Sequence, residues 1–151
     1  MEYTGALKTL QEKIGYHFKN EALLVEAMTH ASFAYEAREK DISDNGRLEF
    51  LGDSILGIII AEELYRKHPN APEGELTRLR SLLVNRDSLS KAAKTLGISE
   101  YMRLGRGEEK TLGRMNSTNL AGVFEALIAA IYLDGGFEEA KKFIFKTSPE
   151  I

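Results

Sequence analysis

The sequence predicts a single all-α domain. Apolar residues recur at three- and four-residue spacing along most of the 151 residues, which is the period of a helix that packs on one side. No stretch alternates between apolar and polar residues over a useful strand length. There is no internal repeat, linker or low-complexity segment, so residues 1–151 are expected to form one domain.

The first half of the chain is expected to contain three helices. Two of them cover residues 6–14 and 21–30, and Asn20 is of a residue type that caps the second. A long helix follows over about 45–67. It stops before Pro69, because proline disfavours helical backbone in the residue before it.

The next two helices are marked by turn and cap residues. One is expected over 73–84, entered through a turn that contains Pro72. Another is expected to begin with Asp87 or Ser88 as its cap and to end at Gly97.

The last third of the chain contrasts a polar segment with the most apolar helix. Residues 105–117 are polar and contain glycines, so a loop is expected there. A strongly apolar helix is expected over 118–134, ended by a Gly-Gly pair, and an amphipathic helix over 137–145.

The composition is that of an ordinary globular protein, with 43% hydrophobic and 28% charged residues. There is no cysteine, which excludes disulfides and thiolate metal sites. Residues 1–8 do not resemble a signal peptide, and the most apolar segments, 48–60 and 120–133, are too short to span a bilayer. We therefore expect a cytoplasmic protein with no membrane partner.

The charge is unevenly distributed along the chain. The net charge is −3, but residues 76–115 hold nine Lys/Arg and four acids, which is +5 locally and leaves −8 elsewhere. Such a segment can provide the positive surface that a nucleic-acid backbone needs. Ordinary solvated helix faces explain it equally well.

Three carboxylates stand in apolar helical surroundings. Glu49 and Asp53 are four residues apart and share one helix face among leucine, phenylalanine and isoleucine. Glu125 is the one charged residue in the fourteen from 120 to 133. An ionised carboxylate is costly to bury unless it is paired or binds a metal.

Two explanations of these carboxylates remain open from spacing alone. A divalent cation such as Mg²⁺ would neutralise all three, with Mn²⁺ able to substitute, and would support phosphodiester hydrolysis. Alternatively, Glu49 or Glu125 pairs with a buried arginine, for instance Arg47 or Arg80.

The segment Asn45–Ser54 closely resembles the signature of the ribonuclease III family. Other segments resemble the same family in the same order along nearly the whole chain: 10–18, 29–32, 73–80, 124–127 and 132–134.

This resemblance implies an all-α endonuclease domain that forms a homodimer and cleaves double-stranded RNA, for RNA processing such as rRNA maturation. It implies that Glu49, Asp53 and Glu125 bind the metal and that Asp53 and Glu125 are catalytic. It also implies that Phe50 packs into the partner subunit, although core packing explains Phe50 equally well from the sequence alone. His30 is interpreted as a packed or hydrogen-bonded structural residue.

The resemblance also indicates where RNA would lie. Glu73 stands where the family has an acidic residue near the cleavage site, although a solvated turn residue is an equal alternative. Candidate RNA contacts are the Lys/Arg of 78–114, Arg78 and Arg106 among them, because A-form RNA is recognised through its shape and backbone.

Two positions depart from the family pattern. Gly46 replaces the usual glutamate, and Gly122 replaces an aspartate of the acidic cluster, one turn before Glu125. Three accounts compete for Gly122: the three remaining carboxylates suffice with extra water, Asn119 stands in, or the site is weakened and the chain is an RNA-binding or assembly module that does not cut. Retention of the three carboxylates favours activity.

The family's usual C-terminal double-stranded-RNA-binding domain is also missing from these 151 residues. Either the chain is truncated or it is a natural minimal form.

Overall fold

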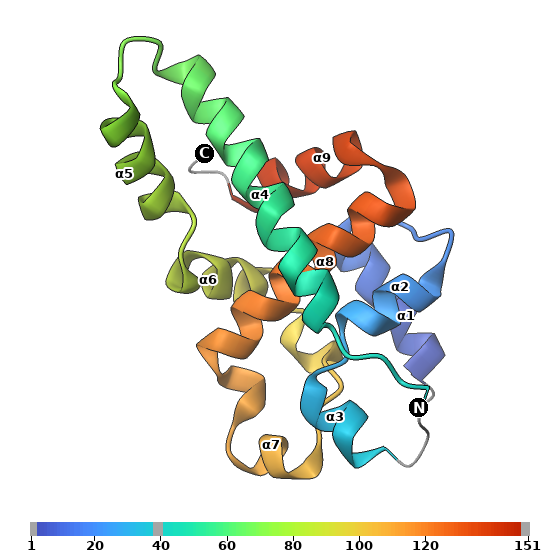
Figure 1. Ribbon diagram of the computed structural model, residues 1–151. Coiled ribbons are helices and arrows are strands. Elements are labelled where there is room, and N and C mark those ends of the chain that lie inside the picture. Colours follow the sequence, from blue (N-terminus) through green and yellow to red (C-terminus); the bar gives the residue numbers. More distant parts are fainter. Residues whose placement is uncertain (1–2, 38–40, 149–151) are drawn as a thin grey trace.

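The computed structural model describes residues 3–37 and 41–148 (Figure 1). These residues form α-helices and two short 3-10 helices, labelled η1 and η2, with one isolated bridge, between Thr29 and Arg103, and no strand within the described ranges. The elements are α1 Tyr3–Ile14, α2 Glu21–Ala27, α3 Ala31–Glu36, α4 Gly46–Lys67, α5 Glu73–Leu83, α6 Arg86–Leu96, η1 Ser99–Tyr101, α7 Arg106–Lys110, η2 Gly113–Met115, α8 Ser117–Gly135 and α9 Phe137–Thr147.

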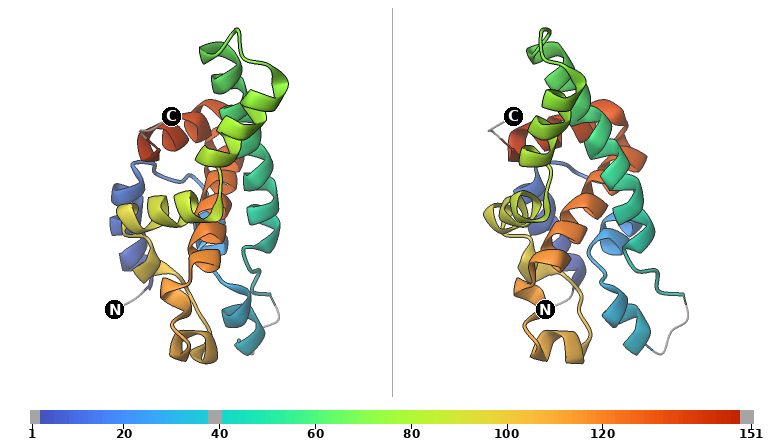
Figure 2. Two further views of the ribbon diagram at one scale, coloured as in Figure 1. Left: turned by 90° about the vertical axis from the view of Figure 1, so that its left-hand side faces the viewer. Right: turned by 60° about the vertical axis from the view of Figure 1, so that its left-hand side comes forward.

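Helix α8 is the centre of the fold. Between Leu120 and Ile131 every residue except Glu125 is buried, as expected for a helix that is apolar all round. Helices α2, α4, α6 and α9 pack against α8, and α4 lies beside it in all three views (Figures 1 and 2). The candidate site is built on this pair of helices.

Gly52 brings α4 and α8 into close contact. A Cβ atom at this position would lie 1.8 Å from the backbone oxygen of Glu125, which is far inside van der Waals contact. Only glycine therefore allows the two helix backbones to approach so closely. This contact places the first third of α4 against the turn of α8 that carries Glu125.

Helix α5 projects from this body (Figure 1). It packs against α4, and none of its residues is buried. None of the helices in the described ranges is long and apolar enough to cross a membrane.

Several helix boundaries differ from the sequence-based predictions: α1 begins at Tyr3 and not at residue 6, and α9 ends at Thr147 and not at residue 145. The second helix ends at Ala27 and not at residue 30, because the His30 amide donates to the Arg103 carbonyl instead of continuing the helix. The cap of α6 is Asn85, whose Oδ1 accepts from the Ser88 amide, so the assignment to Asp87 or Ser88 was wrong.

The segment 105–117 is not the loop that its composition predicts. It contains α7 and η2. The carboxylate of Glu36, at the end of the unpredicted helix α3, accepts hydrogen bonds from the Arg106 and Gly107 amides. A side chain distant in sequence thus satisfies the first amides of a short, polar helix.

Candidate functional site

Glu49 and Asp53 lie on α4 beside the turn of α8 that carries Glu125. Glu49 and Glu125 are half-buried, and Asp53 is exposed. All three carboxylates line one pocket of about 270 Å³. Its lining residues are Glu49, Asp53, Val84, Asn85, Arg86, Leu89, Thr118, Ala121, Gly122 and Glu125.

The pocket disfavours negative charge on its own carboxylates. Burial, followed by the neighbouring Asp53 and Glu49, raises the pKa of Glu125 to about 8. Burial also raises the pKa of Glu49, against an opposing effect of His30. Near neutral pH a protonated Glu125 can donate a hydrogen bond to Asp53. A bound cation would relieve both the desolvation and the mutual repulsion.

The arginine-pairing explanation finds no support in the structure. Neither Glu49 nor Glu125 forms an ion pair with any residue that the structure describes. Arg47 lines a different cavity, beside Phe50, and Arg80 lies in a pocket between α4 and α5. Neither acid is therefore paired with an arginine, although Arg86 lines the same pocket.

The three carboxylates share a pocket, but they do not converge as a ready coordination shell. Within residues 3–37 and 41–148 no group of three His, Cys, Asp or Glu side chains is arranged to hold a metal ion. The oxygen donors nevertheless suit Mg²⁺, which keeps several waters and uses only one or two direct carboxylates. The residues fit a partly hydrated ion.

The carboxylate of Glu49 fills the space beside Gly122. A Cβ at position 122 would lie 2.7 Å from Oε2 of Glu49 and 3.1 Å from its Cδ. Gly122 thus leaves room for an acid that belongs to α4. The space that a side chain at position 122 would fill is therefore occupied by the carboxylate of Glu49.

Asn119 is engaged elsewhere. Its Nδ2 donates to Oε2 of Glu108 (2.8 Å) and to the Gly113 carbonyl (3.0 Å), so its Oδ1 faces His30 Nε2 at 3.1 Å. His30 Nδ1 accepts a hydrogen bond from the Ser32 amide (3.1 Å). His30 is hydrogen-bonded, as the sequence interpretation holds, and Asn119 does not line the carboxylate pocket.

The predicted RNA-contacting residues are dispersed over the surface. Arg78 is paired with Glu75 at 2.7 Å, and Arg106 is exposed at the start of α7. Glu73 lines a pocket between α4 and α5 and not the carboxylate pocket of its own chain.

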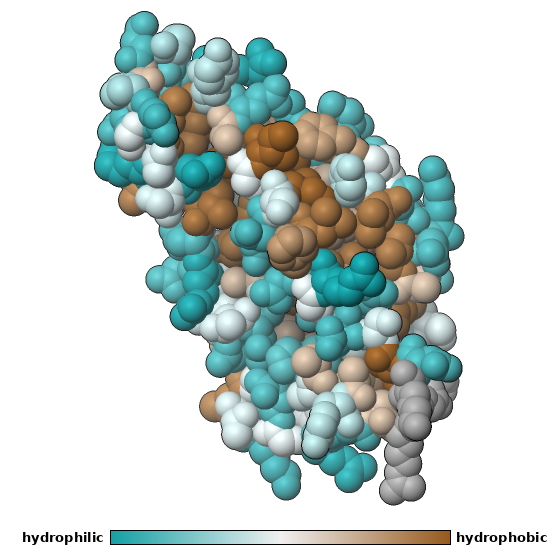
Figure 3. All heavy atoms as spheres, viewed as in Figure 1, coloured by the Kyte–Doolittle hydropathy of each residue, from teal (hydrophilic) through white to brown (hydrophobic). Residues whose placement is uncertain are grey.

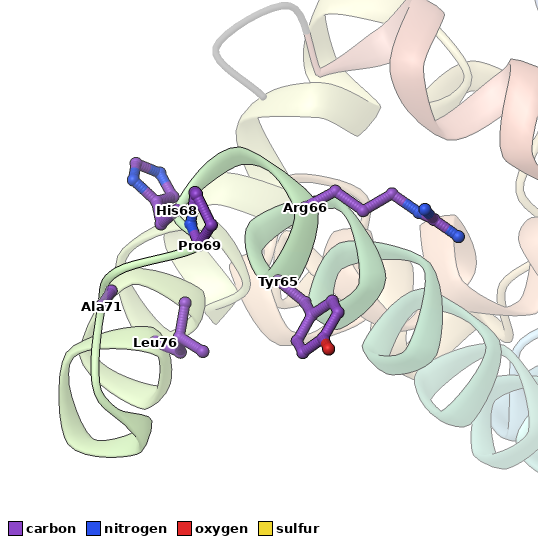
Figure 4. A pocket seen from close by; sticks show the side chains of 6 residues that line it. All are labelled: Tyr65, Arg66, His68, Pro69, Ala71 and Leu76. Carbon is purple, nitrogen blue, oxygen red and sulfur yellow. The ribbon is translucent and has the colours of Figure 1, made fainter.

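A further pocket of about 410 Å³ lies at the turn between α4 and α5 (Figure 4). It is lined by Tyr65, Arg66, His68, Pro69, Ala71 and Leu76, with no carboxylate among them. This pocket is separate from the acidic one and offers no comparable chemistry.

Phe50 is not a core residue. Its side chain is 78% exposed on α4, so core packing is wrong as an explanation. Apolar side chains gather on the face of the molecule over α4 (Figure 3). Phe50 lies beside a cavity of about 520 Å³ whose lining is Leu23, Glu26, Gly46, Arg47, Leu48, Phe50, Leu51 and Leu133.

Sequence reasoning missed one charged residue of the acidic pocket. Arg86, the first residue of α6, lines it beside Asn85. The basic character of 76–115 included this arginine in a group of nine, but nothing in the pattern distinguished it.

Comparison with known proteins places these features in a family. The model of the ribonuclease-III-like family matches residues 20–149. A protein named Ribonuclease 3 from Syntrophotalea carbinolica is 46% identical over 135 residues, which cover 89% of this chain and 58% of the relative. Ribonuclease 3 from Symbiobacterium thermophilum is 47% identical over 135 residues, covering 89% of this chain and 56% of that protein. The chain thus spans less than two thirds of the length of these relatives.

Solved structures agree with the sequence relatives. The nuclease domain of ribonuclease III from Campylobacter jejuni superposes with a TM-score of 0.86 at 36% identity, covering 93% of this chain and 94% of that one. Dicer from Pichia stipitis gives a TM-score of 0.64 at 26% identity over 89% of this chain and 56% of that one. On sequence, fold and signature together, the chain belongs to the ribonuclease-III-like family.

Proposed function

We propose that residues 1–151 form the nuclease domain of a ribonuclease III-type endoribonuclease. It hydrolyses phosphodiester bonds of double-stranded RNA as a homodimer, in RNA processing such as rRNA maturation, with Mg²⁺ or, in its place, Mn²⁺. The observation that carries this proposal is the pocket in which Glu49, Asp53 and Glu125 meet without an ion pair to any described residue. We propose that it acts in the cytoplasm, the compartment that the cysteine-free sequence favours.

Glu49, Asp53 and Glu125 are the residues that would hold the metal. When bound, Mg²⁺ supplies positive charge at the scissile phosphate and lowers the pKa of an attacking water. The protein holds the three acids at fixed positions on two packed helices, with Gly52 setting the separation of α4 and α8. In the metal-free site burial raises the pKa of Glu125 to about 8, and a bound cation would favour its ionised form.

Duplex RNA would be recognised through its backbone. A-form RNA offers phosphates and 2′-hydroxyls over a wide, shallow minor groove, so shape and charge matter more than base sequence. Arg106 is exposed and available for such contacts, whereas Arg78 must exchange its pairing with Glu75. Glu73 lies away from the carboxylate pocket of its own chain, so any role at a cleavage site would be at the second subunit of the dimer.

The homodimer is proposed from the exposed apolar face of α4. Phe50 stands beside a cavity large enough for an aromatic side chain, so two copies related by a twofold axis could exchange Phe50 side chains. The Campylobacter jejuni nuclease domain is described as having a region involved in dimer formation.

The proposal is tested with end-labelled duplex RNA at low salt, incubated with Mg²⁺, Mn²⁺ or EDTA. We expect cutting that requires the metal and is abolished by Glu125→Gln. Glu138→Gln is the matched control, because Glu138 is an exposed acid on α9. Equal loss in both variants, or cutting in EDTA, would contradict the proposed site.

A non-catalytic RNA-binding module is the second candidate. It is favoured by Gly122, which supplies no carboxylate, and by the lack of a ready three-ligand group among the described residues. The same assay separates the two. A duplex that is retarded on a gel but stays intact with Mg²⁺ and Mn²⁺ would establish the binding module.

A further inference from the structure

Arg86 contributes the single positive charge to the wall of the carboxylate pocket. Among the described residues that line this pocket, three are acids and Arg86 is the one Lys or Arg. It is the first residue of α6, and Asn85 just before it caps that helix. The acids line the pocket from α4 and α8, whereas Arg86 lines it from the start of α6, together with Val84, Asn85 and Leu89.

The side chain of Arg86 is not engaged by the protein. It is exposed, and it takes part in no hydrogen bond or ion pair with the described residues. Several other arginines are engaged: Arg66 with Glu62, Arg78 with Glu75, Arg114 with Glu109, and Arg103 over the ring of Phe33.

Arg86 also forms no ion pair with the acids that it faces. The groups that act on Glu125 are Asp53 and Glu49, and those that act on Glu49 are His30 and Asp53. Arg86 lines the same pocket with an exposed side chain, so its charge lies at the rim. The adjacent Asp87 is exposed and forms no ion pair with it.

We infer that Arg86 binds a phosphate of the RNA strand at the rim of the pocket and holds that strand against Glu49, Asp53 and Glu125. This inference rests on the proposed function. Three carboxylates repel an incoming phosphate, so the strand needs a cationic contact close to them. A guanidinium suits this role because its fork of N–H groups can bind two phosphate oxygens at once. Arg86 is a substrate-binding residue in this account.

The test compares Arg86→Ala with Lys91→Ala in the whole chain. Lys91 is an exposed cation on the same helix that does not line the pocket, so its loss removes the same charge at a different place. Duplex RNA binding is measured by fluorescence anisotropy in EDTA over a range of salt concentrations. Cleavage is measured with Mg²⁺ to obtain kcat and KM separately.

We expect Arg86→Ala to weaken duplex binding about tenfold, with Lys91→Ala within about twofold of the unchanged chain. The slope of log affinity against log salt should fall by about 0.7–0.9, the value for one phosphate contact. The loss should appear mainly in KM, and Arg86→Lys should recover part of it, because the charge returns without the two-pronged geometry.

Three results would overturn the inference. One is an equal change in duplex affinity and KM for Arg86→Ala and Lys91→Ala in a chain that still cleaves RNA. Arg86 would then contribute only general surface charge, and the proposed function would stand. Another is a loss in Arg86→Ala that comes with a lower unfolding temperature, showing a structural role. If the unchanged chain neither binds nor cuts duplex RNA, the proposed function and the inference both fail.

Discussion

The carboxylate of Glu49 lies where a side chain at position 122 would stand, 2.7 Å from the Cβ that Gly122 lacks. The position of the Glu49 carboxylate on α4 therefore depends on the absence of a side chain at Gly122 on α8. A glycine within a helix costs about 1 kcal/mol relative to alanine. In this chain the space that the glycine leaves is used by an acid of the candidate site.

Gly122→Ala is expected to displace Glu49. Because Oε2 is at the end of a flexible side chain, the protein should fold, and the free energy of unfolding should rise by less than about 1 kcal/mol, the helix-propensity gain. Binding of Mn²⁺, measured by calorimetry, should weaken about tenfold. Gly57→Ala is the control: it gives the same gain in helix propensity without displacing a side chain, since a Cβ there meets nothing within 4 Å. Unchanged Mn²⁺ affinity in Gly122→Ala would show that the position of Glu49 does not matter.

Gly52→Ala is expected to damage the fold itself. The added Cβ would lie 1.8 Å from a backbone oxygen of Glu125, which cannot rotate away, so α4 and α8 must separate. We expect a loss of about 3 kcal/mol or more in the free energy of unfolding by urea. Gly57→Ala on the same helix should instead be neutral or stabilising. A Gly52→Ala protein as stable as Gly57→Ala would contradict the close helix contact.

The stability of the metal-free protein should fall as pH rises through the range in which Glu125 ionises. The pKa of Glu125 is about 8 in the folded protein against an ordinary 4.5, so between these values the folded state holds a proton that the unfolded state lacks. The free energy of unfolding therefore decreases from pH 4.5 towards pH 8 and is then constant in this contribution.

Thermal unfolding in EDTA between pH 5 and pH 9 measures this dependence. Glu125→Gln should flatten the profile, because glutamine does not titrate, whereas Glu138→Gln should leave it unchanged. A profile that is as steep in Glu125→Gln as in the unchanged chain would rule out Glu125 as its source.

Phe50→Ala is expected to dissociate the proposed homodimer. Removing an exposed aromatic anchor at the centre of an interface weakens association, here by at least about tenfold. Sedimentation of the protein at micromolar concentration measures the change. Tyr35→Ala is the control, because Tyr35 is 91% exposed but lies on α3, away from the cavity beside Phe50. A chain that is monomeric without any substitution would contradict both the dimer and this role of Phe50.

The candidate site was only partly predictable. The spacing of Glu49 and Asp53 places them on one helix face, and the apolar helix around Glu125 marks that residue as unusual. The sequence could not show that these helices meet, that Asp53 is exposed, or that Arg86 shares the pocket, since each depends on how separate helices pack.

The long helices could be predicted from local patterns, because apolar periodicity and cap residues act within a few residues of one another. Contacts between residues far apart in the sequence form only when the helices pack. The carboxylate of Glu36, on α3, accepts hydrogen bonds from the first amides of α7, so part of the polar segment 105–117 is helical. Because Gly52 has no side chain, α4 can lie against the backbone of Glu125, and the three carboxylates of α4 and α8 therefore line one pocket. Contacts of this kind follow from the packing of whole helices, and no local pattern of residues encodes them.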